Sequence, residues 1–190
     1  LGVDGDDTGV AFREQGYLVL ATEASLPVLT SNHALQRAEG ADIISLQGAS
    51  LQARFPWLNM AGLVGGFFGA SNEGWVDPYM LLQAYRRKAR SLGVEFVSDE
   101  ALHIEHEGGL ARAVRLRGAG RIGAGVVLNS AGASGSRALA RSLGVDIPIE
   151  SRLRTTFVFE CRDDLADAPL TILPNGSAWR PEGTRHIATL

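Results

Sequence analysis

The sequence feature that most constrains the fold is a well-capped helix followed directly by a run of β-forming residues. Asp77 is a good N-cap residue, and Pro78 stands at the first helical position. Side chains that recur at helical spacing predict one stripe on this helix, made of Leu81, Tyr85, Lys88 and Leu92. Gly93 ends the helix, and 94–97 (Val-Glu-Phe-Val) predicts a strand.

Other segments add elements of both kinds. Apolar runs predict strands, and Gly108-Gly109 joins two of them in a hairpin: 17–21, 101–107 with 110–117, 125–129 as a buried strand, and 153–160. Capping and stop signals predict helices over 25–39, 48–54 and 134–143. The glycine-rich stretch 58–70 predicts irregular strands with close approach of their backbones.

Composition excludes several classes of protein. The net charge of −3 lacks the basic excess of a nucleic-acid-binding domain. No run of about 18 apolar residues predicts a membrane span. Cys161 is the single cysteine, so no internal disulfide is possible, and a reducing cytoplasm is the expected compartment.

Three local patterns imitate binding motifs. The stretch 118–123 matches G-x-G-x-x-G, but β-forming residues follow it, so we predict a glycine-rich hairpin turn and no phosphate site. His103 and His106 lie three apart on a predicted strand and therefore point to opposite faces. The acidic N-terminus, with Asp4, Asp6 and Thr8, lacks the Glu that closes a calcium loop. We therefore expect no metal site.

The functional hypothesis depends on three segments taken together. The first is 74–97, which holds the capped helix and the strand after it. The second is 126–133 (Val-Val-Leu-Asn-Ser-Ala-Gly-Ala), an apolar strand whose exit carries small residues before a helix begins. Small residues there let a ligand approach free backbone N–H groups. The third is 143–160, a loop through Pro148 that enters a strand.

The order and spacing of these segments resemble the D-amino-acid-oxidase superfamily of FAD-dependent oxidoreductases, which includes glycine oxidase and sarcosine oxidase. The stretches 54–56 (Arg-Phe-Pro) and 179–183 (Trp-Arg-Pro-Glu-Gly) resemble these enzymes as well, so the likeness runs from about residue 16 to 183. It implies a parent enzyme that oxidises the C–N bond of an amino acid or secondary amine by hydride transfer to FAD.

The resemblance also implies roles for individual residues. The backbone at Leu102 would meet the adenine of FAD, and Ser130, Ala131 and Gly132 would lie near its ribose and phosphates. Arg154, Trp179 and Arg180 would belong to the substrate sheet, where an arginine can pair with a substrate carboxylate. The alternatives are structural: Arg154 and Arg180 as surface or interdomain ion pairs, and Trp179 as packing.

The expected fold combines a partial FAD-binding α/β domain at 75–145 with an α+β substrate domain at 10–70 and 150–190, whose mixed sheet is mainly antiparallel. The true nucleotide-binding turn and the closing C-terminal segment of the family are missing from the sequence, so we expect a fragment truncated at both ends. It should be inactive alone and should not retain FAD. A complete small protein with a processed start is the alternative.

Two further functions stay open at this point. The chain could be a non-catalytic folded fragment or interaction module, or part of a flavin dehydrogenase of a hydroxy acid or glycerol phosphate. Because a missing first βαβ unit would leave strand edges exposed, we also expect a possible homo-oligomer through those edges. The catalytic residues are not predicted.

Overall fold

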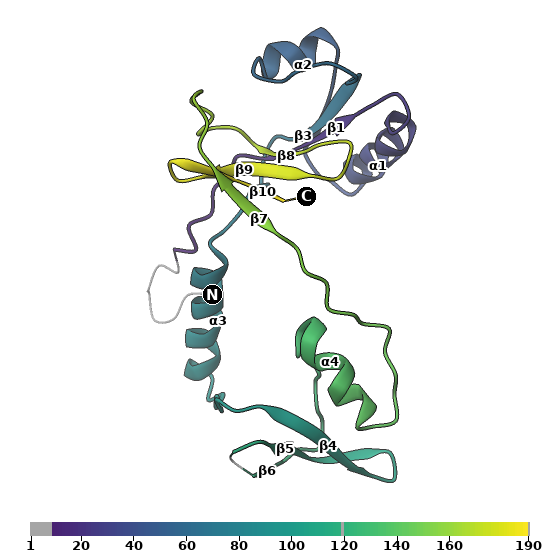
Figure 1. The fold of residues 1–190 in the computed structure, drawn as a ribbon, viewed down its shortest axis with the longest axis vertical. Helices are drawn as coiled ribbons and strands as arrows, with labels where there is room; N and C mark the ends of the chain where they lie inside the picture. Colours follow the sequence, from purple (N-terminus) through teal and green to yellow (C-terminus); the bar gives the residue numbers. More distant parts are fainter. Residues whose placement is uncertain (1–8, 119, 190) are drawn as a thin grey trace. The chain divides into compact units, whose positions relative to one another are not determined.

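The computed structural model describes residues 9–118 and 120–189, which form two compact units (Figure 1). The first, here called the sheet unit, comprises 9–92 and 154–189. The second, here called the hairpin unit, comprises 93–153. The helix that follows Asp77 belongs to the sheet unit.

The sheet unit is built on a seven-stranded sheet in the order β2-β3-β1-β8-β9-β10-β7. Only β1 and β8 pair in parallel, and the other neighbours are antiparallel, so the predicted mainly antiparallel mixed sheet is confirmed. The strand bounds are β1 Tyr17–Ala21, β2 Ile43–Gln47, β3 Gly65–Gly69, β7 Thr156–Phe159, β8 Leu170–Ile172, β9 Ala178–Glu182 and β10 Arg185–Thr189.

Two helices cover opposite faces of the first strands. In β1, alternate side chains point to opposite faces, so Leu18 and Leu20 share one face. On that face α2, Ala49–Arg54, contributes the fully buried Leu51 to the main apolar core. On the other face α1, Leu26–Ala38, places His33 against the ring of Phe67 in β3 at 5.4 Å between ring centroids. Both helices match the predicted ranges closely.

The helix α3, Pro78–Ser91, has the predicted cap, because the Met80 N–H donates to Asp77 Oδ1 at 2.8 Å. The predicted apolar stripe is wrong as a buried face. Ala84 is the buried residue of this helix, whereas Tyr85 is 57% exposed and Leu92 is 72% exposed. The physical reason is that little of the described chain packs on the Tyr85 side.

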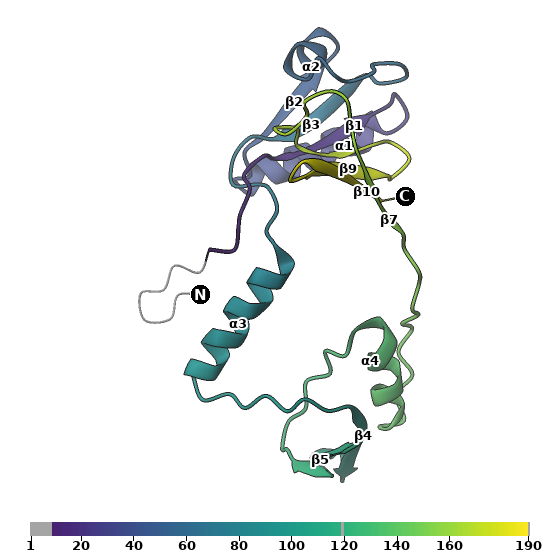
Figure 2. The same ribbon diagram turned by 60° about the vertical axis from the view of Figure 1, so that its left-hand side comes forward.

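The hairpin unit carries a three-stranded antiparallel sheet in the order β4-β5-β6. The helix α4 contacts β4, and both are labelled in Figure 2. The bounds are β4 Ala101–Glu107, β5 Leu110–Leu116, β6 Arg121–Gly123 and α4 Gly132–Arg141. Within the glycine-rich stretch 118–123, residues 121–123 form β6, which pairs antiparallel with β5, and residue 119 lies outside the described residues.

Two predicted strands do not form. The segment 94–97 is irregular and exposed, and 125–129 is extended but pairs with no strand in the part of the chain that is described. Val126 and Leu128 are 89% and 88% exposed, so the prediction of a buried strand is wrong here. A strand requires hydrogen-bonding neighbours, and within 9–118 and 120–189 this segment has none. Of the predicted strand 153–160, only β7 forms.

Among the described residues, no cluster of His, Cys, Asp or Glu could hold a metal ion. The stretch with Asp4, Asp6 and Thr8 lies outside these residues. None of the helices in 9–118 and 120–189 has the length and apolar character of a membrane span. Cys161 is exposed and free.

Candidate functional site

The predicted adenine-contacting residue, Leu102, lies at an irregularity of the β4–β5 ladder. The register steps from Ala101 opposite Leu116 to His103 opposite Arg115, so the ladder skips Leu102. Its side chain is 46% exposed. A skipped residue leaves backbone polar groups outside the ladder, where a ligand can reach them.

The predicted ribose and phosphate contacts lie where α4 begins. Ala131 is the N-cap residue, and its side chain cannot cap the helix. Asn129 holds the turn, because its Oδ1 accepts from the Ala131 N–H at 3.3 Å and its Nδ2 donates to the Ser136 carbonyl at 2.9 Å. Gly132 has φ +67°, and a side chain there would meet no atom within 4 Å. This open helix start has the features that suit an anionic group near free N–H donors.

Elements from both stretches border one cavity in the hairpin unit. Ile104 and His106 of β4, Val127 and Asn129 of the extended segment, and Ala140 of α4 line a space of about 580 Å³. Leu102 and Ser130–Gly132 are not among its lining residues. The structure therefore gathers the elements that carry the predicted cofactor residues into one compact unit, with these residues outside the cavity wall.

The predicted substrate residues in β9 point in different directions. Trp179 and Arg180 are successive strand residues, so their side chains emerge on opposite faces of the sheet. Trp179 lies with its ring centroid 5.3 Å from that of Trp57 and 5.7 Å from that of His186. His186 is 6% exposed, and neither of its ring nitrogens has a partner in the described residues. Trp179 thus belongs to an aromatic cluster.

Arg180 is held on the other face of β9. Its guanidinium lies 5.0 Å from the ring centroid of Trp75, its Nη1 donates to the Pro181 carbonyl at 3.1 Å, and it pairs with Glu182. Only 17% of its side chain is exposed. Arg154 is exposed just before the edge strand β7. Because Trp179 and Arg180 occupy opposite faces, the three residues do not form one cluster.

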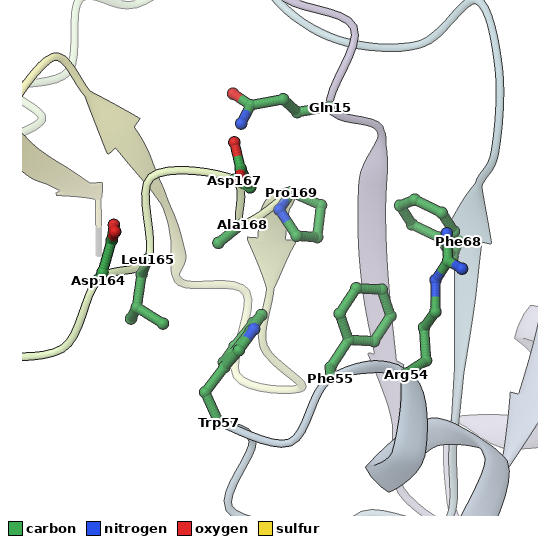
Figure 3. A pocket seen from close by; sticks show the side chains of 10 residues that line it. All are labelled: Gln15, Arg54, Phe55, Trp57, Phe68, Asp164, Leu165, Asp167, Ala168 and Pro169. Atoms are coloured by element: carbon green, nitrogen blue, oxygen red, sulfur yellow. The ribbon is translucent and has the colours of Figure 1, made fainter.

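A pocket that the sequence does not reveal lies beside the main core of the sheet unit (Figure 3). It has a volume of about 370 Å³, and its polar lining comes from Gln15, Arg54, Asp164 and Asp167. Gln15 Nε2 donates to the Ala166 carbonyl at 2.7 Å, while its Oε1 is buried without a partner among the described residues. Contacts that join residues 151 positions apart leave no signal in local sequence patterns.

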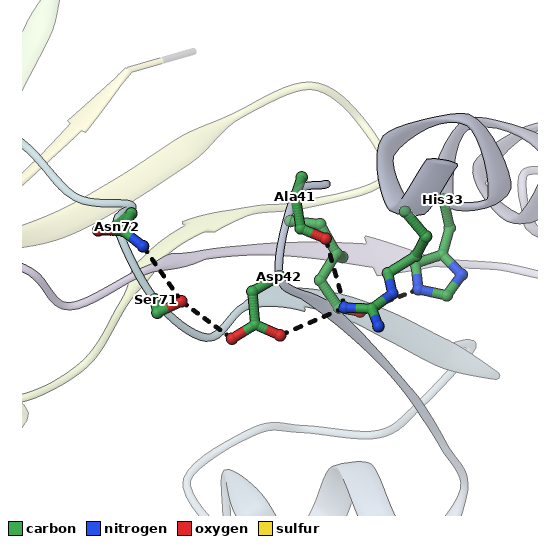
Figure 4. A network of polar contacts seen from close by, with 7 residues as sticks. His33, Ala41, Asp42, Ser71 and Asn72 are labelled. Atoms are coloured by element: carbon green, nitrogen blue, oxygen red, sulfur yellow. Dashed lines mark hydrogen bonds and ion pairs between the residues drawn. The ribbon is translucent and has the colours of Figure 1, made fainter. Parts of the chain in front are cut away.

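A polar network ties α1 to the strands beside it (Figure 4). Asp42 accepts from Ser71 Oγ at 2.9 Å and from Arg37 Nη1 at 3.3 Å. His33 Nε2 donates to the Ile43 carbonyl at 3.0 Å at the start of β2. These groups satisfy backbone and side-chain polar atoms at a sheet edge, so the network has a structural role.

The shifted pKa values of the molecule belong to surface ion pairs. A hydrogen bond from Arg121 at 2.8 Å lowers the pKa of Glu105, and one from Arg117 at 2.7 Å lowers that of Glu100. On the hairpin sheet, Arg115 and His103 also lower the pKa of Glu105.

The comparisons with known proteins identify the class of protein. The model of the family described as DAO, FAD-dependent oxidoreductase, matches residues 5–188. The chain belongs to this family. The resemblance inferred from the three sequence segments is thereby confirmed, and so is FAD as the cofactor of the family.

The chain is similar to particular members of the family. It is 32% identical to FAD-dependent oxidoreductase domain-containing protein 1 of Bos taurus over 95% of the chain and 43% of that protein. The protein of the same name in Xenopus laevis is 30% identical over 96% of the chain and 43% of its own length. The chain therefore spans less than half the length of the curated relatives it matches.

Solved structures share the fold. L-proline dehydrogenase from P. horikoshii has a TM-score of 0.84 at 19% identity, with 96% of this chain and 50% of that chain covered. Glycine oxidase from Geobacillus kaustophilus has a TM-score of 0.77 at 20% identity, covering 95% of this chain and 48% of that one. L-Amino acid deaminase from Proteus myxofaciens has a TM-score of 0.70 at 24% identity, covering 97% and 42%.

Proposed function

We propose that the chain is part of a flavoenzyme that oxidises the C–N bond of an amino acid or secondary amine. The observation that carries the proposal is the family match over 5–188 together with the mainly antiparallel seven-stranded sheet. The solved proteins of this fold support the substrate class, because proline, glycine and L-amino acids stand in their names. This two-electron oxidation would convert an amine to an imine, for which bound FAD would supply the hydride acceptor and solvent would take the N–H proton.

The hairpin unit would supply the residues on the adenine side of FAD. The backbone of Leu102, which the ladder skips, would face the adenine. The small residues Ser130, Ala131 and Gly132 would lie near the ribose and phosphates, since the start of α4 is uncapped and open at Gly132. When bound, FAD supplies the redox chemistry, and these residues position it.

The sheet unit would supply the substrate side, and its three predicted residues differ in suitability. Arg180 is the best of them for a substrate carboxylate, because Trp75 and the Pro181 carbonyl fix its guanidinium plane. A substrate would have to compete with Glu182 for it. Trp179, in β9, and Arg154, just before β7, would also lie on the substrate side. We further propose that the 190-residue chain alone is inactive and that the protein is cytoplasmic.

Flavin binding provides the first test. We expect the purified chain to be colourless and to leave FAD fluorescence unchanged in a titration, because the first nucleotide-binding turn of the family is not in this sequence. A polypeptide of the relatives' length that contains this sequence should bind FAD and release ammonia when it is given amino acids. Oxidation of a 2-hydroxy acid or glycerol phosphate without ammonia release would overturn the proposed reaction.

A substitution at the start of α4 tests the cofactor residues in that longer polypeptide. Ala131→Asp places a negative charge where the phosphates would lie, so FAD affinity should fall by about tenfold, which equals about 1.4 kcal/mol. Ala138→Asp adds the same charge at an exposed position farther along α4 and serves as the control. Equal affinity in both variants would remove Ser130–Gly132 from the cofactor site.

A further inference from the structure

The last strand of the seven-stranded sheet, β7, has an open edge. It pairs with β10 on one side, with Phe159 opposite His186 and Phe157 opposite Ala188. All four of its residues are exposed, and Phe157, Val158 and Phe159 are 47%, 60% and 39% exposed. One row of backbone N–H and C=O groups on β7 therefore faces outward.

The opposite edge of the same sheet is protected. At β2 the Ile43 carbonyl accepts from His33, and Ser50 Oγ bonds both the N–H and the carbonyl of Gln47, at 3.0 and 2.8 Å. In β7 no described side chain or loop bonds to 156–159. The strand also lacks the charge, proline or bulge that keeps natural edges from pairing.

The charges that flank β7 favour a second copy of the same strand as its partner. Arg154 precedes the strand and has no ion pair within the described residues, and Glu160 follows it. The ion pair of Glu160 with Arg185 is long, 3.6 Å, with both side chains mostly exposed. When two copies of the strand run antiparallel about Phe157, each Arg154 stands opposite a Glu160. A parallel arrangement would instead place like charges beside each other.

The same register matches the apolar residues. Phe157 of one copy would face Phe157 of the other directly across the two-fold axis, and Thr156 would face Val158. Aromatic and β-branched cross-strand pairs of this kind stabilise antiparallel ladders. Phe157 and Phe159 lie on the face of the sheet that also carries His186, so the pairing would extend the aromatic cluster across the axis.

We propose that β7 is a self-association edge, through which two copies of this chain join into one continuous sheet in the antiparallel register centred on Phe157. The inference does not depend on the proposed enzymatic activity. It names an isologous contact, because the same patch is used on both copies. The fraction of chains in the dimer therefore rises with the concentration of the chain.

A charge swap tests the register. Light scattering of the whole chain at micromolar concentration should give twice the 20.2 kDa of one copy. Arg154→Glu alone and Glu160→Arg alone each place like charges opposite each other and should weaken the dimer by about tenfold. The double variant restores opposite charges and should restore the dimer. A chain that stays monomeric, or a double variant no better than the single ones, overturns the proposal.

Cross-linking gives a second measurement that leaves the charges intact. In a Cys161→Ser background, Phe157→Cys places two thiols at directly opposed positions, whose Cα atoms would be about 4.5–5.5 Å apart, within disulfide range. Thr155→Cys is the control, since the register sets it opposite Phe159. Rapid disulfide formation by the first variant only supports the register. Equal cross-linking of both variants, or of neither, overturns it, with circular dichroism confirming that each variant is folded.

Discussion

The sheet unit and the hairpin unit hold their apolar residues in different ways. In the sheet unit, Leu18 of β1 and Leu51 of α2 are fully buried, because strands and helices of the same unit cover them. The hairpin unit buries Ile104 and Ala113 within its small sheet but leaves Val126 and Leu128 almost completely exposed. An apolar, β-forming segment thus becomes a strand only where the described chain offers it a neighbour.

The hairpin unit, which buries fewer apolar side chains, carries ion pairs on its surface. On the hairpin sheet Glu105 pairs with Arg115 at 3.3 Å and with Arg121 at 2.8 Å. Ion pairs of this exposed kind each contribute little to stability, typically about 0–1 kcal/mol. The comparison therefore predicts that substitutions inside the sheet unit have large effects, whereas matched substitutions in the hairpin unit have small ones.

The largest effect is expected from truncating the main core. Leu18→Ala removes a fully buried side chain and leaves a cavity, so the free energy of unfolding should fall by about 2–5 kcal/mol. Val126→Ala removes an exposed one and should change it by less than about 0.5 kcal/mol. Urea unfolding measures both: tryptophan fluorescence reports the sheet unit, which holds Trp57, Trp75 and Trp179, and circular dichroism reports the whole chain.

The contrast between the two units is wrong if both substitutions lower the free energy of unfolding by the same amount. A large loss from Val126→Ala would mean that the 125–129 segment is covered in solution, and self-association at the concentration used would then be measured in parallel.

A smaller effect is expected where a glycine permits close approach of the backbone. Gly16 has φ +73°, and a Cβ atom there would collide with the Gly69 carbonyl and the ring of Phe68. Gly16→Ala should therefore cost about 1–3 kcal/mol in the denaturant titration. Gly125→Ala is the matched control in the hairpin unit, since its Cβ would meet no atom within 4 Å and its φ is not positive. A neutral Gly16→Ala would show that the β1–β3 region adjusts more freely than its packing indicates.

Local signals predicted much of this fold. The apolar run 17–21, the Asp77 cap and the Gly108-Gly109 hairpin each involve residues close in sequence, and the corresponding strand, helix and hairpin all form. The strands predicted at 94–97 and 125–129 fail because β-forming residues alone do not supply a hydrogen-bonding neighbour.

The candidate site was less predictable than the fold. The family resemblance pointed to the start of α4 and to Leu102, and local features of the structure suit a ligand at both. It grouped Trp179 with Arg180, although strand periodicity already separates adjacent residues onto opposite faces. The pocket at Gln15 had no sequence signal, because its partner carbonyl, that of Ala166, comes from a distant segment of the chain.

The smallest effect is expected from the pH dependence of an ion pair in the hairpin unit. Arg137 lowers the pKa of Asp146 through a hydrogen bond at 2.9 Å, and Arg141 adds a second one at 3.2 Å. Because the folded state lowers this pKa, the contribution of Asp146 is fully present above the pKa of the unfolded chain, about 4, and is lost as pH falls through the lower folded value.

The chain should therefore lose stability as the pH falls below about 4, and Asp146→Asn should lack that part of the loss. The two proteins should differ in the midpoint of urea unfolding at neutral pH and converge in acid. Since Asp146 is 62% exposed, the difference at neutral pH should be the smallest of those predicted here. A difference that persists unchanged in acid would show that Asp146 acts through packing or a cap instead of through its charge, and the hairpin unit would then depend less on ion pairs than its surface indicates.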